Sequence, residues 1–362
     1  MNLYNLMAGL AAGDALGATS EFQPLHEIAS TYLKHKASGW PFTAVGGGAF
    51  GFKPGYPTDD AEMARAIIDA WLATAEENEF DTPHFDGEKI AHNFVDWMNG
   101  NPPDMGMATR ATLSAVRDGE VWWKGGYAFW KSNRHAWSNG SLMRNGIVAA
   151  TGATDFDVFR NTLHHGLITH WAPLPAICCA AQNWLIRNYR EWLSGDSGAE
   201  ILSPSWLVAF RRDWDFWLGS EEDSIVQHWR DTTLEDHPEA WQVFEAADFN
   251  PDTFRPFAHI EHIGFVLTTF QIGVWAMQWA ERDCAYPIEF LPVGFPTEPF
   301  ERTGAEVISW VAMIGRDSDT YGATAGPMVA AVKELRPELV DRLKAVEDLP
   351  REMPAPPPSR RN

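Results

Sequence analysis

The chain has 362 residues, 45% of them hydrophobic, so it is long enough to bury a large core. Its 49 acidic and 28 basic side chains give a formal net charge of −21, which argues against nucleic acid as a partner because phosphate backbones attract Lys and Arg. The three cysteines include the adjacent pair Cys178 and Cys179, which favours a reducing, cytoplasmic compartment over a disulfide framework. The first residues carry Asp14 and no basic start, so no signal peptide is expected.

Helical periodicity dominates the chain. Apolar residues recur at i, i+3, i+4 and i+7 in segments at residues 3–10, 63–72, 174–185, 266–277 and 307–314. The apolar run over 263–279 is interrupted by Gln271 and Gln278, which indicates core rather than a membrane span. Alternating β-branched runs are nearly absent, so the sequence predicts an all-α bundle in a single domain over 1–352. The Pro-rich residues 353–362 are expected to be a disordered tail.

The first group of chemically active residues precedes the helix predicted over 63–72. Thr58, Asp59 and Asp60 follow a Gly-rich stretch that is expected to be extended and to end at Pro57. Helix capping alone explains this group, with Thr58 or Asp59 as the N-cap and Glu62 completing a capping box.

The second group lies in IGRDSDTYGATAG, residues 314–326. Asp317, Asp319 and Thr320 stand between a helix expected to end near Gly315 and the next helix, which Pro327 predicts to be bent or to start late. Capping explains one of these acids but not both.

Together the two groups predict a metal site. Four carboxylates held side by side would repel one another unless cations lay between them. Ligands that are all oxygen select hard ions such as Mg²⁺ or Mn²⁺, and two such ions about 3.5–4 Å apart would suit four acids and two threonines.

Six segments in order carry a family resemblance. They are GLAAGDALGATSEF (9–22), PTDD (57–60), PPDMGMATR (102–110), NGSLMRNGIVA (139–149), ITHW (168–171) and GRDSDTYGATAG (315–326). In these segments the chain resembles the ADP-ribosylglycohydrolases of the dinitrogenase reductase-activating type. It departs from the family pattern at Arg316, Ser318, Tyr321, Trp171 and Ala172.

The resemblance implies a compact orthogonal multi-helix bundle with two Mg²⁺ or Mn²⁺ ions in a cleft. The implied metal ligands are Thr58, Asp59, Asp60, Asp317, Asp319 and Thr320. The ions would position the distal ribose of ADP-ribose on a modified protein, and the bond from its anomeric carbon to an acceptor, often arginine, would be cleaved. The implied substrate contacts are Gly106, Asn139, Gly140, Ser141, Met143, His170, Gly315 and Gly322.

Several of these residues also have plain structural interpretations. Asp104 could activate water or protonate the leaving group, or it could form a turn after two prolines. Glu21 could contact substrate and water, or it could be a solvated acid. Asn139 to Ser141 could start a helix whose amides bind pyrophosphate, or they could form a turn and a cap. His170 could face the ligand or be structural.

Alternative functions come from other classes. The chain could be a non-catalytic relative, or a binding protein that inhibits an ADP-ribosyltransferase toxin, a role compatible with hydrolysis. A hydrolase could also act on serine-linked or nucleotide-linked ADP-ribose or on O-acetyl-ADP-ribose. Residues 192–241 form a Trp-rich acidic insertion, with six of the 18 tryptophans, that either packs on the bundle or faces a basic partner.

Overall fold

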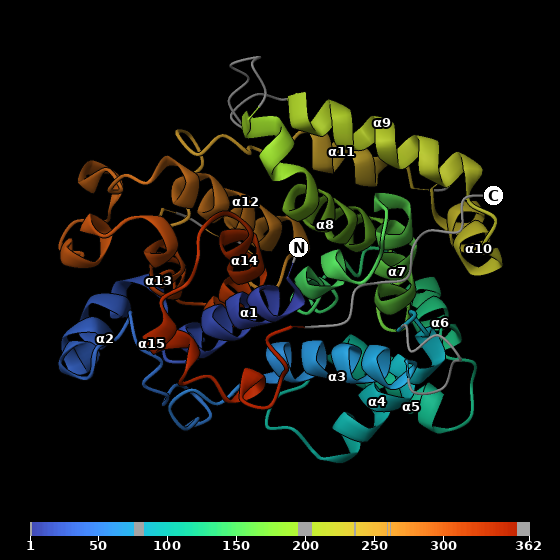
Figure 1. Ribbon diagram of the computed structural model, residues 1–362, viewed down its shortest axis with the longest axis horizontal. Helices are drawn as coiled ribbons and strands as arrows, with labels where there is room; N and C mark the ends of the chain where they lie inside the picture. The colour runs from blue at the N-terminus through green and yellow to red at the C-terminus, as the bar shows by residue number, and fades with distance from the viewer. Residues whose placement is uncertain are drawn as a thin grey trace. The chain divides into compact units, whose positions relative to one another are not determined.

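The computed structural model describes residues 2–75, 83–194, 205–234, 237–258, 260 and 262–352, with backbone alone at 190–194 and 205. The regular elements in these ranges are helices, and no strand forms there (Figure 1). The predicted all-α fold is therefore confirmed.

The α-helices of the described residues are α1 Leu3–Gly17, α2 Ile28–His35, α3 Asp59–Ala73, α4 Gly87–Asn99, α5 Met107–Arg117, α6 Lys124–Ser132, α7 Asp155–Leu167, α8 Pro173–Ser194, α9 Ser205–Ser220, α10 Ser224–Thr233, α11 Glu239–Glu245, α12 Val266–Arg282, α13 Val307–Ala312, α14 Ser318–Val332 and α15 Pro337–Val340. Short 3-10 helices are η1 Leu25–Glu27, η2 Lys36–Ser38, η3 Gly146–Ala150, η4 Ile288–Phe290, η5 Glu298–Glu301, η6 Gly304–Glu306 and η7 Lys344–Val346. Four of the five segments with helical periodicity are helical throughout, and the fifth is helical over 307–312, so α13 ends before the expected Gly315.

The chain divides into two compact units. The terminal unit contains residues 2–62 and 248–352, and the central unit contains residues 63–247. Helix α3 begins in the terminal unit and continues in the central one. The single domain over 1–352 stays a prediction, and the tail at 353–362 lies outside the described residues.

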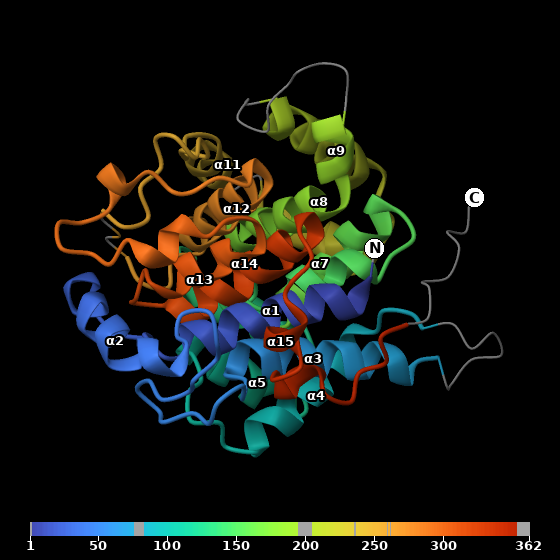
Figure 2. The ribbon, with the colours of Figure 1, turned by 60° about the vertical axis from the view of Figure 1, so that its left-hand side comes forward.

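Two glycine-lined helices lie at the centre of the terminal unit. Helices α1 and α14 lie side by side (Figures 1 and 2). A Cβ atom on Gly13 would lie 1.9 Å from the backbone oxygen of Gly322, and one on Gly326 would lie 1.9 Å from that of Gly9. Because no side chain intervenes, the two backbones touch, and the first turn of α14 is fixed against the end of α1.

Helix α14 does not start late. It begins at Ser318 and continues through Pro327, so the predicted delay is wrong. This helix is buried from Ser318 to Val329 and packs against α1, and this packing compensates for the hydrogen bond that proline removes.

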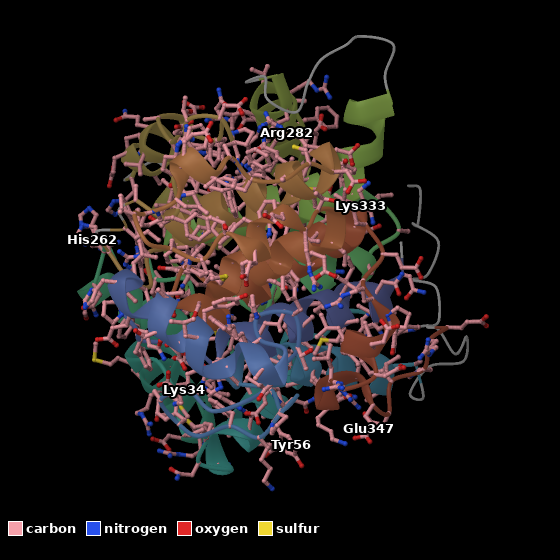
Figure 3. The ribbon with its side chains drawn as sticks, turned by 90° about the vertical axis from the view of Figure 1, so that its left-hand side faces the viewer. Lys34, Tyr56, His262, Arg282, Lys333 and Glu347 are labelled. Atoms are coloured by element: carbon pink, nitrogen blue, oxygen red, sulfur yellow. The ribbon has the colours of Figure 1, made fainter. Side chains whose placement is uncertain are left out.

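Helix α12 packs on α14 and accounts for the long apolar run. Trp275, Trp279 and Trp310 are buried around the ring of Tyr286. Arg282 lies at the end of α12 (Figure 3). It forms ion-paired contacts of 2.7 and 2.8 Å with Asp252. Among the described residues, no helix combines the length and apolar character needed to cross a bilayer.

The Gly-rich stretch before α3 is folded into turns rather than extended. Gly46, Gly48 and Gly55 have φ values of 71°, 69° and 75°, a conformation that favours glycine. A Cβ on Gly48 would lie 1.8 Å from the backbone oxygen of Ala18, so this stretch packs closely on the end of α1. The expectation of an extended approach is wrong, and the close contact explains why glycine is needed.

The Trp-rich insertion belongs to the core of the central unit. Among its described side chains, all five tryptophans are buried: Trp206, Trp214, Trp217, Trp229 and Trp241. The rings of Trp214 and Trp217 lie 5.4 and 5.3 Å from that of Phe159 on α7. The structure supports packing on the bundle, and the proposal that these tryptophans face a partner is wrong. The side chain of Trp192 lies outside the described residues.

Candidate metal-binding active site

The start of α3 positions two of the predicted metal ligands. Helix α3 begins at Asp59, and Thr58 is its N-cap residue because its carbonyl accepts the Glu62 N–H at 3.1 Å. The Thr58 hydroxyl donates to Oδ2 of Asp60 at 2.9 Å and accepts from the Asp60 N–H at 3.4 Å. The predicted cap and the predicted ligand role are therefore compatible.

A carboxylate from α1 accepts hydrogen bonds from backbone amides at the start of α3. Asp14 is fully buried and accepts the backbone N–H groups of Thr58 and Ala61 at 3.0 and 3.2 Å. Burial raises its pKa well above the usual range, and the charge of Asp60 adds to this effect. Sequence reasoning missed this role, although a lone acid in the Ala- and Gly-rich GLAAGDALG was a usable signal.

The start of α14 brings the second predicted group to the same place. Asp317 is the N-cap residue, and Asp319 and Thr320 follow in the buried first turn. Between the two acids, the Ser318 hydroxyl donates to the backbone oxygen of Gly17 at 2.8 Å, which fastens α14 to α1. The hydroxyl of Ser318 therefore has a structural role.

Three carboxylates from the two groups converge. Ligand oxygens of Asp59, Asp60 and Asp319 all lie within 4.8 Å of one another. Burial, followed by the charge of Asp317, raises the pKa of Asp60 to about 7. Burial also raises the pKa of Asp319 well above its usual range, with the charges of Asp60 and Glu21 next in effect. We call Asp59, Asp60 and Asp319 the acid cluster.

The acid cluster has the chemistry of a hard-cation site. Oδ1 of Asp60 and Oδ1 of Asp319 are buried and accept no hydrogen bond within the described part of the chain. Buried carboxylate oxygens without donors are costly unless a cation compensates them. Since the donors are oxygen atoms, the residues present fit Mg²⁺ or Mn²⁺ better than zinc.

Glu21 is buried close to this cluster. It is only 4% exposed, so the interpretation as a solvated acid is wrong. The loop that carries it is fixed by the Phe22 N–H, which donates to the Arg316 oxygen at 2.5 Å, and by the Arg316 N–H, which donates to the Gln23 oxygen at 2.7 Å. Phe22 and Arg316 both have φ near 60°, so each non-glycine residue holds a left-handed conformation at this junction.

Comparison with known proteins decides the family. A family model described as ADP-ribosylglycohydrolase matches residues 2–355. The chain belongs to the ADP-ribosylglycohydrolase family. This confirms the family that the sequence motifs predict.

Two curated relatives are similar over parts of this ADP-ribosylglycohydrolase-family chain. The ADP-ribosyl-[dinitrogen reductase] glycohydrolase of Rhodospirillum rubrum is 37% identical over 28% of this chain and 30% of its own length. The ADP-ribosylarginine hydrolase Tri1 of Pseudomonas putida (strain GB-1) is 29% identical over 55% of this chain and 48% of its own. The chain therefore spans about half or less of these relatives.

A solved structure extends the comparison of the fold. An ADP-ribosylglycohydrolase-related protein complex matches with a TM-score of 0.59 at 21% identity, over 95% of this chain and 93% of that one. At this identity the likeness shows the fold alone.

Two of the predicted glycine contacts have structural explanations in this family member. Gly315 has φ of 69°, and a Cβ there would lie 2.5 Å from the backbone oxygen of Gln23. Gly322 lies in the contact with Gly13 of α1. Turn geometry and helix packing therefore account for both glycines without a substrate.

Asp104 and Gly106 lie in the loop before α5, in the central unit. Asp104 is half-buried, and its Oδ1 accepts the N–H of Met105 at 2.7 Å. Gly106 is the N-cap residue of α5 and is exposed. A bond to the adjacent amide does not make a turn, so the turn-forming role and the catalytic role of Asp104 both stay predictions.

The segment from Asn139 to Met143 does not start an α-helix. It forms turns before the 3-10 helix η3, and the N–H groups of Leu142 and Met143 donate to the Asn139 oxygen at 2.8 and 3.0 Å. Ser141 and Met143 are buried. The expected α-helix at this point is therefore wrong, and contact of Asn139, Gly140 and Ser141 with pyrophosphate stays a prediction.

His170 sits in a buried polar network with Arg144, a residue that sequence reasoning did not single out. Its Nδ1 lies 2.8 Å from the Thr169 hydroxyl and its Nε2 lies 2.9 Å from the Ser138 hydroxyl. Arg144 donates to Thr169 at 2.6 Å and to the Gly140 oxygen at 2.5 Å. Burial, followed by the charge of Arg144, lowers the pKa of His170 to about 3, so the ring is neutral. In the sequence, the arginine of the segment NGSLMRNG could have indicated this network.

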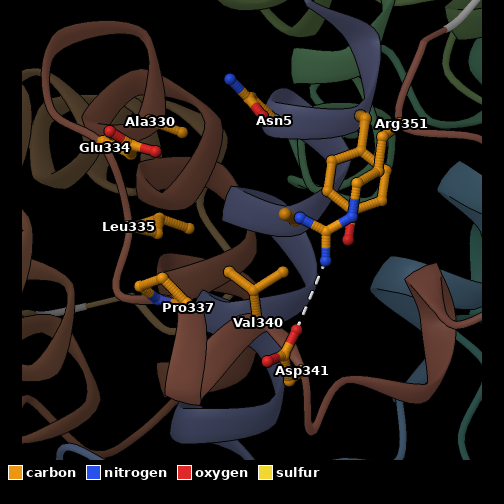
Figure 4. A pocket seen from close by; sticks show the side chains of 10 residues that line it. Asn5, Ala330, Glu334, Leu335, Pro337, Val340, Asp341 and Arg351 are labelled. Carbon is orange, nitrogen blue, oxygen red and sulfur yellow. Dashed lines mark hydrogen bonds and ion pairs between the residues drawn. The ribbon is translucent and has the colours of Figure 1, made fainter.

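Described residues of the terminal unit line a small cavity and a larger one. One of about 90 Å³ lies between α1 and the segment after α14, where Arg351 pairs with Asp341 at 3.4 Å (Figure 4). It contains none of the predicted site residues. The other, of about 380 Å³, is lined by Arg316, which directly precedes Asp317, and by Pro24, three residues after Glu21.

Proposed function

We propose that this chain removes ADP-ribose from modified protein arginine by hydrolysing the bond at the anomeric carbon of the distal ribose. The observation that carries the proposal is the acid cluster, with its two unsatisfied buried oxygens, in a chain of the ADP-ribosylglycohydrolase family. The arginine acceptor is supported by the similarity to a protein named ADP-ribosylarginine hydrolase.

The acid cluster would hold the expected pair of Mg²⁺ or Mn²⁺, with Asp317, Thr58 and Thr320 as the remaining ligands. When bound, the ions would neutralise the carboxylates and anchor the ribose hydroxyls. The chain prepares this site through the Asp14 cap of α3 and the Ser318 contact to α1, which hold the ligands before substrate arrives.

Glu21 is our first candidate for the carboxylate that directs water. It is buried, and its charge raises the pKa of Asp319, so it lies near the same cluster. The water oxygen would bond to the anomeric carbon as the carbon–nitrogen bond breaks through an oxocarbenium-like transition state. The leaving guanidine nitrogen would keep the electron pair and receive the proton from water. Asp104 remains the second candidate.

The decisive experiment uses targets modified at arginine or at serine, from which the transferase has been removed. With Mg²⁺ or Mn²⁺ present, released ADP-ribose is measured by chromatography. We expect release from the arginine-linked target and at least about a 100-fold loss in Asp319→Asn. A comparison of Glu21→Gln with Asp104→Asn identifies the water-directing residue.

The same experiment separates the alternatives. A pure inhibitor of a transferase would release nothing once the transferase is gone, and a serine-specific hydrolase would release only from the serine target. No release from the arginine target, or release by Asp319→Asn at the wild-type rate, would overturn the proposal. Toxin reversal and a cytoplasmic location stay predictions.

A further inference from the structure

Three side chains of metal-binding type converge in the central unit, and none belongs to the acid cluster. One ligand atom from each of His135, His237 and Glu239 lies within 4.8 Å of the other two. Nδ1 of His237 lies 2.7 Å from Oε1 of Glu239, and Nε2 of His135 lies 3.7 Å from the same oxygen. Two imidazoles from separate segments therefore point at one carboxylate oxygen.

The backbone around these residues is fixed by local hydrogen bonds. After α6, the Trp137 N–H donates to the His135 oxygen at 2.8 Å. After α10, the His237 N–H donates to the Thr233 oxygen at 3.0 Å, and Glu239 is the first residue of α11. Local turns and the start of α11 therefore hold the backbone of His135, His237 and Glu239 in place.

Aromatic neighbours hold both imidazole rings. The ring of His135 lies 5.3 Å from that of Trp137, and the ring of His237 lies 5.6 Å from that of Trp130, both edge to face. The His237 side chain is 14% exposed and that of His135 is 67% exposed. One face of the group is therefore packed, and the other is open to solvent.

The donor set differs from that of the acid cluster. Two imidazoles and a carboxylate suit zinc, which is often bound by three protein ligands with water in the fourth position. Tetrahedral zinc with bonds of about 2.0–2.1 Å places its donors roughly 3.3 Å apart, between the 2.7 and 3.7 Å seen here.

An ordinary surface ion pair would account for two of these side chains but not for the third. His26 and Glu27 form such a pair at 3.9 Å, with both side chains exposed. In the central unit a third donor from a different segment joins the pair, which an ion pair alone does not require.

We propose that His135, His237 and Glu239 form a Zn²⁺ site that joins the segment after α6 to the start of α11. The fourth position is open on the solvent side. The site is independent of the proposed hydrolase activity.

Zinc titration of the full chain tests the proposal. The protein carries no polyhistidine tag, is stripped with chelator and is kept in excess Mg²⁺, and zinc chloride binding is followed by calorimetry. We expect wild type to bind one zinc at this site. His135→Ala and Glu239→Gln should bind it at least about tenfold more weakly and lose the zinc-induced rise in Tm. His26→Ala is the matched control and should bind as wild type does.

Repeating the titration in Asp319→Asn removes any zinc that the acid cluster takes, and near-UV circular dichroism shows that each variant is folded. The proposal is overturned if wild type shows no zinc binding tighter than about 1 mM. It is also overturned if His135→Ala and Glu239→Gln are both weakened less than tenfold.

Discussion

At the scale of single residues, the carboxylates of the acid cluster that we propose for activity should lower the stability of the metal-free protein. Asp60 and Asp319 each carry a buried oxygen that has no donor among the described residues, and burial with neighbouring charge raises the pKa of both. Such an arrangement weakens the fold unless cations compensate the charge. Removing one charge should therefore affect activity and stability in opposite directions.

We expect Asp60→Asn to lower hydrolase activity at least about 100-fold, because one strong electrostatic ligand is lost. In chelator the same variant should have a higher Tm than wild type, since one buried negative charge is gone.

Asp69→Asn on the same helix is the control. It breaks an exposed ion pair with Arg65 at 2.7 Å and should cost about 0.3–0.5 kcal/mol while leaving activity unchanged. Near-wild-type activity of Asp60→Asn would refute the ligand assignment.

His170 gives a pH prediction. Its pKa is about 3 in the fold and about 6.5 in the unfolded chain, so between these values only the unfolded chain binds the proton. Because the folded protein keeps this ring neutral, the free energy of unfolding decreases as pH falls from about 6.5 towards 3. Above pH 6.5 the ring is neutral in both states and does not change this free energy. His170→Gln should remove up to about 1.4 kcal/mol per pH unit from the slope of unfolding free energy.

Urea denaturation at several pH values and constant Mg²⁺ measures this slope. The exposed His92 on α4 provides the control, because His92→Gln should leave the slope unchanged. A slope equal to that of wild type in His170→Gln would contradict the buried neutral imidazole.

At the scale of helices, Asp14 links α1 to the start of α3. Asp14→Ala should leave the Thr58 and Ala61 amides without their acceptor, at a cost of about 1–2 kcal/mol. It should also weaken Mg²⁺ binding, because Thr58 and Asp60 lose their fixed positions. Asp86→Ala removes a comparable cap from α4, so it should cost similar stability but leave Mg²⁺ binding intact. Equal Mg²⁺ affinity of Asp14→Ala and Asp86→Ala in calorimetry would show that Asp14 only caps.

The α1–α14 contact leaves no room for a side chain. Gly13→Ala would place a Cβ 1.9 Å from a backbone oxygen, so the helices must separate. We expect a loss of about 3 kcal/mol or more in urea denaturation, together with weaker Mg²⁺ binding. Gly219→Ala near the end of α9 meets nothing within 4 Å and should be nearly neutral. A similarly small effect at Gly13 would contradict the close backbone contact.

At the scale of the whole molecule, activity should depend on hard cations. Chelation should abolish hydrolysis, and Mg²⁺ or Mn²⁺ should restore it better than Zn²⁺, because the acid cluster offers oxygen donors. ADP-ribose release after each metal is added back measures this order. Full activity in a metal-free preparation would exclude the binuclear site.

Local patterns in the sequence were enough to predict the helical fold and the two acidic groups. Helical periodicity depends on neighbouring residues alone, and it placed α1, α3, α8, α12 and α13. Asp59 and Asp319 could be paired because each belongs to a short motif at a helix start. The same motifs identified the family, which the match over residues 2–355 confirms.

The tertiary structure decided what depends on residues far apart in the chain. Asp14 caps α3 across 44 positions, and Gly13 meets Gly322 on α14; no local pattern encodes either contact. The insertion's tryptophans could have been exposed or buried, and only their packing on α7 showed that they belong to the core. The sequence by itself determined the helices and the types of side chain that could bind a cation, because these depend on local chemistry. Which carboxylate caps a helix and which glycine is required followed only from the fold, because those roles depend on the neighbours that folding brings into contact.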